Sequence, residues 1–276
     1  MNQSIVLITG GSSGIGAATA RILAQAGMTV YAASRRGTSE ASDTPGVVPV
    51  RLDVNDEAAT RALVEQIVAK EGRLDAVVVN AGNGIAGALE ETSDEELRYQ
   101  AETCLFGANK TIRACLPVFR RQHSGRIVTV TSVAAIVPLP FQGAYSGIKS
   151  AMLAMTEALA MELRGSGIQC GSVLPGDTAT GFTGARRYTE ASQRPDSPYR
   201  EACDRNRAKI EKDETGGMSP DVIGKAILRQ LTRRKMAPRV TPRNPAHRLQ
   251  GRRRPGPPRP HPHQTPDTPF PVQLII

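Results

Sequence analysis

The segment 5–16 reads IVLITGGSSGIG, an apolar run followed directly by a glycine-rich loop. Four consecutive apolar residues without polar alternation are typical of a strand that is covered on both faces. The alanine-rich stretch 17–26 then predicts a helix, and a second apolar run, 28–33, predicts another strand. Strand, tight loop, helix and strand together form one βαβ unit, which implies a parallel sheet.

The same alternation continues along most of the chain. We expect strands over 47–52, 75–79, 126–131 and 168–174, and helices over 56–70, 93–102, 105–121, 145–164 and 221–233. Residues 177–217 interrupt this rhythm and predict either a long loop or a helical lid. The pattern predicts an α/β fold with a doubly wound parallel sheet in one domain.

Composition excludes several classes of protein. The 276 residues contain no run that approaches the about 20 apolar residues of a membrane span, and the first ten lack the features of a signal peptide. The four cysteines lie far apart, with no C-x-x-C pair, so we expect reduced, mostly buried thiols and neither a metal site nor a disulfide framework. We therefore expect a cytoplasmic protein.

The net charge of +9 is concentrated near the end of the chain. Residues 237–276 hold seven Arg and one acidic residue, whereas the other 236 residues carry 28 basic and 25 acidic groups. Residues 237–271 also contain eleven Pro and few large apolar side chains, so they cannot bury enough surface to offset chain entropy. We expect a folded domain over 1–236 and a disordered tail over 237–276.

The glycine-rich loop after the first strand is a candidate phosphate-binding site. Its glycines allow a sharp turn and a close approach of a pyrophosphate to the positive end of the following helix. The alternative is an ordinary strand-to-helix turn. The candidate residues are Gly10, Ser12, Ser13, Gly14, Ile15 and Gly16.

The second strand ends in Ser34-Arg35-Arg36, where an NAD-selective site typically has an acidic residue. A carboxylate would repel a 2′-phosphate, whereas an Arg side chain offers it a charge-assisted hydrogen-bonding fork. These three residues therefore favour NADP(H) over NAD(H). The alternative is a pair of solvated arginines at a strand end.

Two further loops follow predicted strands, at the edge where ligands collect in open α/β sheets. Asp53 and Val54 lie in the first loop, where Asp53 is a candidate acceptor for an adenine amine or, alternatively, a helix N-cap. The second loop is Asn80-Ala81-Gly82, in which Asn80 either contributes to the cofactor site or only ties neighbouring strands together.

Ser132, Tyr145 and Lys149 are the candidate catalytic residues. Tyr145 and Lys149 are four residues apart on a predicted helix and so share a face. A free phenol, with a pKa of about 10, is a poor base at neutral pH, but a nearby ammonium and a nicotinamide cation favour the phenolate. Tyr145 would then exchange a proton with an alcohol oxygen that Ser132 also binds, while hydride moves at the cofactor. The alternative is an ordinary amphipathic helix.

Taken together, these motifs resemble the short-chain dehydrogenase/reductase family over residues 1–236. The matching motifs are Thr9-Gly10-x-x-x-Gly14-x-Gly16, Asn80-Ala81-Gly82, Ser132, Tyr145-x-x-x-Lys149 and Pro175-Gly176-x-x-x-Thr180. The resemblance implies a Rossmann-type three-layer sandwich, a nicotinamide cofactor, and Tyr145 as acid/base beside Ser132 and Lys149, with Lys149 also on the nicotinamide ribose. It also implies that the segment containing Pro175, Gly176, Thr178 and Thr180 closes over the nicotinamide carboxamide.

Finer features of the resemblance concern substrate and assembly. The stretch 132–142 is similar to the branch that acts on hydroxysteroids, retinoids and related apolar alcohols or ketones. The family commonly forms homodimers or homotetramers through helices corresponding to 105–121 and 145–164.

Two positions depart from the family pattern. Cys104 stands where members usually have an Asn that supports a water chain to the active-site Lys, and a thiol is a weak hydrogen-bonding group. Asn109, one helical turn further on, is not taken as its replacement. After 239–241, members continue with a last strand and an apolar helix, whereas this chain turns to Pro, Arg and His. A genuine basic extension and a shifted reading frame both explain this change; we favour the frame shift, which an uninterrupted frame on resequencing would exclude.

The sequence favours an NADP(H)-dependent oxidoreductase that acts on an apolar secondary alcohol or ketone, a small molecule bound under residues 177–217. Candidate lining residues are Phe141, Phe182, Tyr188 and Tyr199. A second hypothesis is a catalytically weakened dinucleotide-binding protein with a basic tail. A nucleic-acid binder is the least favoured, because no aromatic residues alternate with Arg252-Arg253-Arg254.

Overall fold

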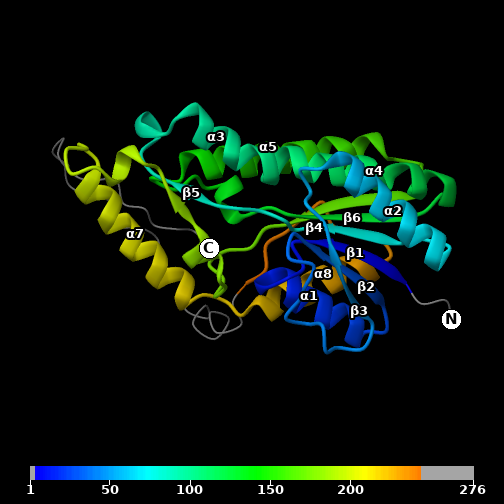
Figure 1. Cartoon of the computed structure of the whole chain (residues 1–276). Helices are drawn as coiled ribbons and strands as arrows, with labels where there is room; N and C mark the ends of the chain where they lie inside the picture. Colours follow the sequence, from blue (N-terminus) through cyan, green and yellow to red (C-terminus); the bar gives the residue numbers. More distant parts are fainter. Residues whose placement is uncertain (1–3, 244–276) are drawn as a thin grey trace, which may run out of the picture. The chain divides into compact units, whose positions relative to one another are not determined.

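The computed structural model describes residues 4–243, and the expected tail beyond residue 243 lies outside the described part. Seven parallel strands form the main sheet, in the order β3-β2-β1-β4-β6-β7-β9 (Figure 1). Their bounds are β1 Ile5–Thr9, β2 Thr29–Ser34, β3 Val47–Arg51, β4 Ala76–Val79, β6 Gly125–Val130, β7 Ile168–Val173 and β9 Arg239–Val240. This is the doubly wound parallel α/β sheet that the sequence predicts.

Helices cover both faces of the sheet (Figure 1). One face packs against α1 (Gly14–Gln25) and α8 (Pro220–Thr232), and the other against α2 (Glu57–Glu71), α4 (Ala108–Gln122) and α5 (Gly143–Glu162). In β1, Leu7 belongs to the core beneath α2, α4 and α5, whereas Val6 and Ile8 belong to the core beneath α1 and α8. Because successive side chains of a strand point to opposite faces, a continuous apolar run is needed to fill both cores.

The expected helices 93–102 and 105–121 lie in one continuous helical stretch. α3 (Asp94–Ala101) begins at a capping box formed by Ser93 and Glu96. A π-helical segment, η2 (Glu102–Gly107), then leads directly into α4. π-helical turns inside helices are frequent at functional sites, and this one holds Cys104.

The segment 177–217 is helical, which is one of its two expected alternatives. It contains α6 (Phe182–Ala185), the short strand β8 (Arg187–Tyr188), the 3₁₀ turn η4 (Ala191–Gln193) and the longer helix α7 (Arg200–Thr215). β8 pairs in parallel with β5 (Ile85–Ala86), which follows β4. Two further 3₁₀ turns, η1 (Leu89–Glu91) and η3 (Val133–Ala135), complete the elements.

Residues 237–243 belong to the same compact unit as the rest of the described chain. β9 pairs with β7 through Ser172 opposite Arg239 and Val173 opposite Val240. The sheet therefore extends beyond residue 236, where composition placed the domain boundary; the Pro/Arg bias hid a two-residue edge strand. Among residues 4–243, no helix is long and apolar enough to cross a membrane.

Candidate active site

The glycine loop between β1 and α1 permits no side chain at three positions. Gly10 and Gly14 have positive φ values of 68° and 54°. A Cβ on Gly16 would lie 2.1 Å from the Gly10 carbonyl oxygen, and one on Gly10 would lie 2.8 Å from the Ala81 Cα. The loop also holds β2, since the Gly11 N–H donates to the Ala33 oxygen at 2.9 Å. These contacts explain why glycine recurs at this spacing.

The N-terminus of α1 fits an anionic ligand. Its N-cap residue, Ser13, makes no side-chain capping hydrogen bond, and the first turn of the helix contains no acidic residue. The backbone N–H groups and the positive end of the helix dipole are therefore available for a phosphate. Together with the closely packed glycines of the loop, this geometry fits the pyrophosphate of a dinucleotide.

The segment from Pro175 to Thr180 lies against this loop. A Cβ on Gly14 would be 3.2 Å from the Thr180 Cβ, so Thr180 packs over the start of α1. Thr178 is buried and donates to the Gly176 carbonyl oxygen at 2.8 Å, and the Pro175 carbonyl oxygen accepts from the Val133 N–H at 2.9 Å. The fold thus brings 175–180 beside both the glycine loop and the turn that follows Ser132.

The end of β2 also reaches the glycine loop. Arg36 Nη2 donates to Ser12 Oγ at 3.0 Å, and both Arg35 and Arg36 are exposed. Ser34 is buried, and its hydroxyl donates to the Thr38 carbonyl oxygen while accepting from the Gly37 N–H. Arg36 therefore lies over the loop, with donors left for an anionic group, whereas Ser34 shapes the turn.

Asp53 and Val54 differ in their surroundings. Asp53 is exposed and accepts from the Asn55 N–H at 3.0 Å. The N-cap of α2 is Asp56, which accepts from the Ala59 N–H, so the capping alternative for Asp53 is wrong. Val54 is buried in the core beneath α2. Asp53 thus remains the candidate for a hydrogen bond to the adenine at the end of β3.

Asn80 ties β4 to the glycine loop. Its side-chain nitrogen donates to the carbonyl oxygens of Thr9 and Gly10, both at 3.1 Å. The Thr9 hydroxyl in turn accepts from the backbone N–H groups of Asn80 and Ala81. Asn80 is thus committed to holding the loop at the point where the strand order reverses.

Lys149 of α5 reaches the end of β6, where Ser132 lies, and Tyr145 of α5 lies beside Lys149. Ser132 follows the strand and caps η3, and its Oγ accepts from the Ala134 N–H at 3.1 Å. Lys149 is 5% exposed, and its Nζ donates to the Val130 carbonyl oxygen at 3.1 Å and lies 5.8 Å from the Tyr145 ring centroid. No ion pair holds Lys149 within residues 4–243. A buried ammonium with one backbone partner keeps further N–H groups for a ligand.

Cys104 lies beside this group. A Cβ on Gly82 would be 3.4 Å from the Cys104 Sγ and 3.7 Å from the Lys149 Nζ, so the exposed Gly82 separates the two side chains. The thiol is fully buried, accepts from Gln100 Nε2 at 3.1 Å and lies 3.2 Å from Asn83 Oδ1. Cys104 thus belongs to a hydrogen-bonded network with the amide side chains of Gln100 and Asn83.

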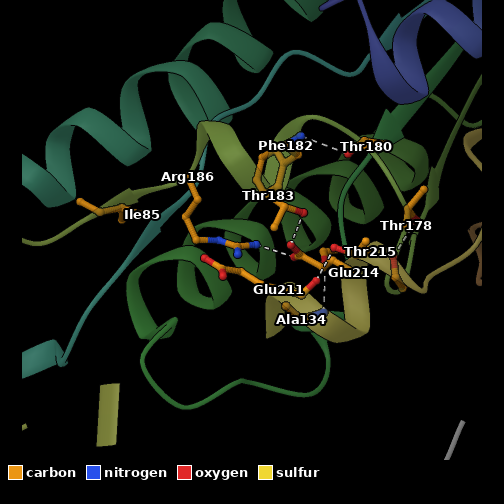
Figure 2. Close-up of polar contacts among 12 residues, drawn as sticks. Ile85, Ala134, Thr178, Thr180, Phe182, Thr183, Arg186, Glu211, Glu214 and Thr215 are labelled. Atoms are coloured by element: carbon orange, nitrogen blue, oxygen red, sulfur yellow. Dashed lines mark hydrogen bonds and ion pairs between the residues drawn. The ribbon is translucent and has the colours of Figure 1, made fainter. Parts of the chain in front are cut away.

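The sequence reasoning missed a cluster of polar side chains in 177–217. Arg186 forms an ion pair with Glu214 of α7, and Thr183 Oγ1 donates to the other carboxylate oxygen at 2.6 Å (Figure 2). Burial lowers the pKa of Arg186, but the hydrogen bond and the charge of Glu214 outweigh burial and raise it, so the guanidinium stays charged. The partners lie 28 residues apart, so no local pattern identifies them.

The four aromatic residues proposed as lining occupy different positions. The Phe182 ring centroid lies 6.0 Å from that of Tyr145, and the Arg186 guanidinium carbon lies 5.6 Å from the Phe182 ring. Phe141 and Tyr199 form an edge-to-face pair. Phe141 and Tyr188 also line a shallow, closely packed recess together with Arg186 and Ile210. Across residues 4–243, no group of His, Cys, Asp and Glu side chains could hold a metal ion.

Comparisons with known proteins agree with this arrangement. The model of the short chain dehydrogenase family matches residues 4–191. A relative from Bacteroides thetaiotaomicron, named 3-ketodihydrosphingosine reductase, is 37% identical over 85% of this chain and 86% of its own length. A solved short-chain dehydrogenase from Streptomyces avermitilis has a TM-score of 0.77 and 31% identity, covering 87% of each chain. One from Burkholderia phymatum in complex with NAD has a TM-score of 0.77 and 23% identity, covering 94% of this chain and 99% of its own; at this identity it shows the fold alone. The chain therefore belongs to the short-chain dehydrogenase/reductase family, whose members are NAD(P)-dependent oxidoreductases.

Proposed function

We propose that this oxidoreductase uses NADP(H) to interconvert an apolar secondary alcohol and its ketone. The observation that carries the proposal is that the Lys149 Nζ bonds to the end of β6, two residues before Ser132, and lies 5.8 Å from the Tyr145 ring. The name of the Bacteroides thetaiotaomicron relative supports a ketone as the oxidised substrate. The ring of Phe182, whose centroid lies 6.0 Å from that of Tyr145, supports an apolar substrate.

Each of the three residues has a chemical task in this proposal. The Ser132 oxygen already accepts from the Ala134 N–H, so its own O–H is free to donate to a carbonyl oxygen. Tyr145 exchanges the proton at that oxygen. Lys149, with its remaining N–H groups, holds the cofactor ribose and provides positive charge beside the phenol. The dinucleotide, when bound, supplies or accepts the hydride.

The cofactor preference rests on Arg35 and Arg36. Both are exposed at the end of β2, and Arg36 already reaches Ser12 in the glycine loop. A 2′-phosphate at this place would meet two cations and no strand-end carboxylate. We assign Ser12, Ser13 and Ile15 to the pyrophosphate, Asp53 and Val54 to the adenine, and Pro175, Gly176, Thr178 and Thr180 to the nicotinamide.

Fluorescence titration tests the cofactor part of this proposal. We expect NADPH to bind more tightly than NADH, and the preference to fall at least about tenfold in Arg35→Ala and Arg36→Ala, the value of one charge-assisted hydrogen bond. Arg21→Ala, which removes an exposed arginine paired with Asp221, is the matched control. Equal affinity for both dinucleotides would contradict the NADP(H) assignment, and turnover of a panel of apolar ketones tests the reaction.

A second function is favoured by Cys104 alone. Family members usually have an Asn amide at this position, whereas here a thiol forms hydrogen bonds with Gln100 and Asn83. A dinucleotide-binding protein with weakened catalysis would result. Tight NADPH binding without turnover of any ketone, together with turnover in Cys104→Asn, would support this reading.

We also propose a cytoplasmic location and a homodimer or homotetramer. All four cysteines are buried and unpaired, which suits a reducing compartment. Phe106, Met155 and Met161 are exposed on η2 and α5 and offer an apolar surface for association. Cell fractionation and sedimentation velocity test the two proposals.

A further inference from the structure

One buried nitrogen in the 177–217 segment has no partner. The Arg186 side chain is 2% exposed, and its Nη2 bonds to Glu214. Its Nη1 is buried and makes no hydrogen bond of normal geometry to a described residue, although the Tyr188 hydroxyl lies close enough to the guanidinium to help raise its pKa. Because buried polar groups are nearly always paired, an unpaired guanidinium nitrogen needs an explanation, and a ligand that supplies the acceptor is one.

The position of Arg186 points to the substrate. Its guanidinium stacks on the Phe182 ring, and the same ring contacts Tyr145, so one aromatic side chain separates Arg186 from the proposed proton donor. Figure 2 shows Phe182, the first residue of α6, and Arg186, which directly follows α6, with the Arg186 guanidinium directed toward Glu214. Arg186 also lines the recess that Phe141 and Tyr188 border.

The charges around Arg186 do not favour an anion. The charges that act on its neighbours Asp177 and Tyr188 include three cations, Arg186, Arg207 and Lys209, and three further carboxylates, Glu211, Asp213 and Glu214. Glu214 neutralises Arg186 directly. A carboxylate or phosphate would therefore meet no excess of positive charge, whereas a neutral oxygen can accept from Nη1 without repulsion.

We propose that Arg186 determines substrate specificity by donating a hydrogen bond from Nη1 to a neutral oxygen of the substrate. This oxygen, of an ether, hydroxyl or carbonyl group, lies a few carbon atoms from the reacting carbon, because the width of the Phe182 ring separates Arg186 from Tyr145. The inference rests on the proposed function, since Tyr145 marks the reacting end. The substrate class becomes an apolar ketone or alcohol that carries a second, uncharged oxygen function.

The test compares matched methyl ketones of increasing chain length that end in an alkyl group, a methoxy group or a carboxylate. The kcat/KM of each is measured with NADPH for the wild type, Arg186→Lys and the neighbouring, exposed Arg187→Lys. Lys keeps a cation opposite Glu214 but lacks the second planar donor. At the best chain length we expect the methoxy ketone to exceed the alkyl ketone at least about tenfold in the wild type and in Arg187→Lys, and to equal it in Arg186→Lys.

A ratio of two substrates on one enzyme cancels any loss of folded protein, so it isolates the specificity of Arg186. Equal kcat/KM for methoxy and alkyl ketones at every length, or a ratio that Arg186→Lys leaves unchanged, would overturn the assignment of Arg186 while leaving the proposed function intact. If the ketone that ends in a carboxylate has the highest kcat/KM, the assignment of a neutral oxygen as the acceptor for Arg186 is wrong. Turnover of none of the ketones, with NADPH bound, would overturn the proposed function itself and this inference with it.

Discussion

The glycine-loop edge, residues 9–16, 34–36 and 80–82, and the segment 177–217 are built in different ways. At the edge, backbone and small residues approach so closely that a single Cβ on Gly16 would meet the Gly10 oxygen. Between the ends of 177–217, which meet where a Cβ on Gly217 would lie 2.5 Å from the Asp177 backbone, Gly181 and Gly184 have no atom within 4 Å of an added Cβ. Charged side chains hold this part of the segment together. The backbone thus shapes the side that binds the family's common cofactor, whereas side chains shape the side proposed to select the substrate.

Tyr145 lies between the two regions and gives the largest expected effect. Removing its hydroxyl in Tyr145→Phe should lower kcat about a thousandfold, because acid/base catalysis by a positioned group contributes roughly 10²–10⁴-fold. The affinity for NADPH should hardly change, since the ring still packs against Phe182. Steady-state kinetics and fluorescence titration measure the two quantities. Unchanged turnover would remove Tyr145 from the proposed chemistry.

Gly16→Ala and Gly184→Ala test the contrast between the regions directly. The first places a Cβ 2.1 Å from the Gly10 oxygen, so we expect a loss of about 3 kcal/mol in unfolding free energy and of NADPH affinity. The second adds a methyl group in open space on α6, so stability should be unchanged or slightly increased. Urea unfolding measures both. Equal losses at the two positions would contradict the comparison.

Glu214→Gln tests whether the buried ion pair supports 177–217. The substitution leaves the Arg186 charge facing a neutral amide, so the unfolding free energy should fall by about 2 kcal/mol, the value of a hydrogen bond to a charged group. Glu157→Gln, which removes the exposed pair with Arg239, is the matched control and should cost less than about 1 kcal/mol. Equal losses of unfolding free energy in the two variants would contradict the expectation that the buried ion pair contributes more than the exposed one.

The smallest effect concerns pH. The hydrogen bond from Arg239 outweighs burial and, together with the charge of Arg239, lowers the pKa of Glu157 below its ordinary 4.5. A lowered folded-state pKa contributes stability that is present above the unfolded value and is lost as pH falls through the folded value. The difference in unfolding free energy between wild type and Glu157→Gln should therefore shrink between pH 7 and pH 3. Because both side chains are partly exposed, salt should reduce it further.

Much of the fold could be predicted from local patterns. The apolar runs of β1, β2, β4, β6 and β7 and the amphipathic helices lie within a few residues of their expected bounds. A strand that is buried on both faces is a continuous apolar run and a surface helix has a 3.6-residue apolar repeat, and both are local patterns. The strands β9 and β5 were not predicted, because two-residue strands depend on a neighbouring strand edge rather than on their own sequence. The π-helical segment that contains Cys104 was not predicted either, because it depends on the packing around it.

The amino-acid sequence by itself determined the family, the doubly wound sheet and the identity of Ser132, Tyr145 and Lys149 as candidates, since glycine spacing and the i, i+4 pair are local features. Only the tertiary structure decided that Asn80 is committed to the Gly10 loop, that Asp56 rather than Asp53 caps α2, and that Arg186 is buried with an unpaired nitrogen. These outcomes depend on contacts between segments far apart in the chain, because burial and ion pairing are properties of neighbours in space and leave no periodic signal along the sequence.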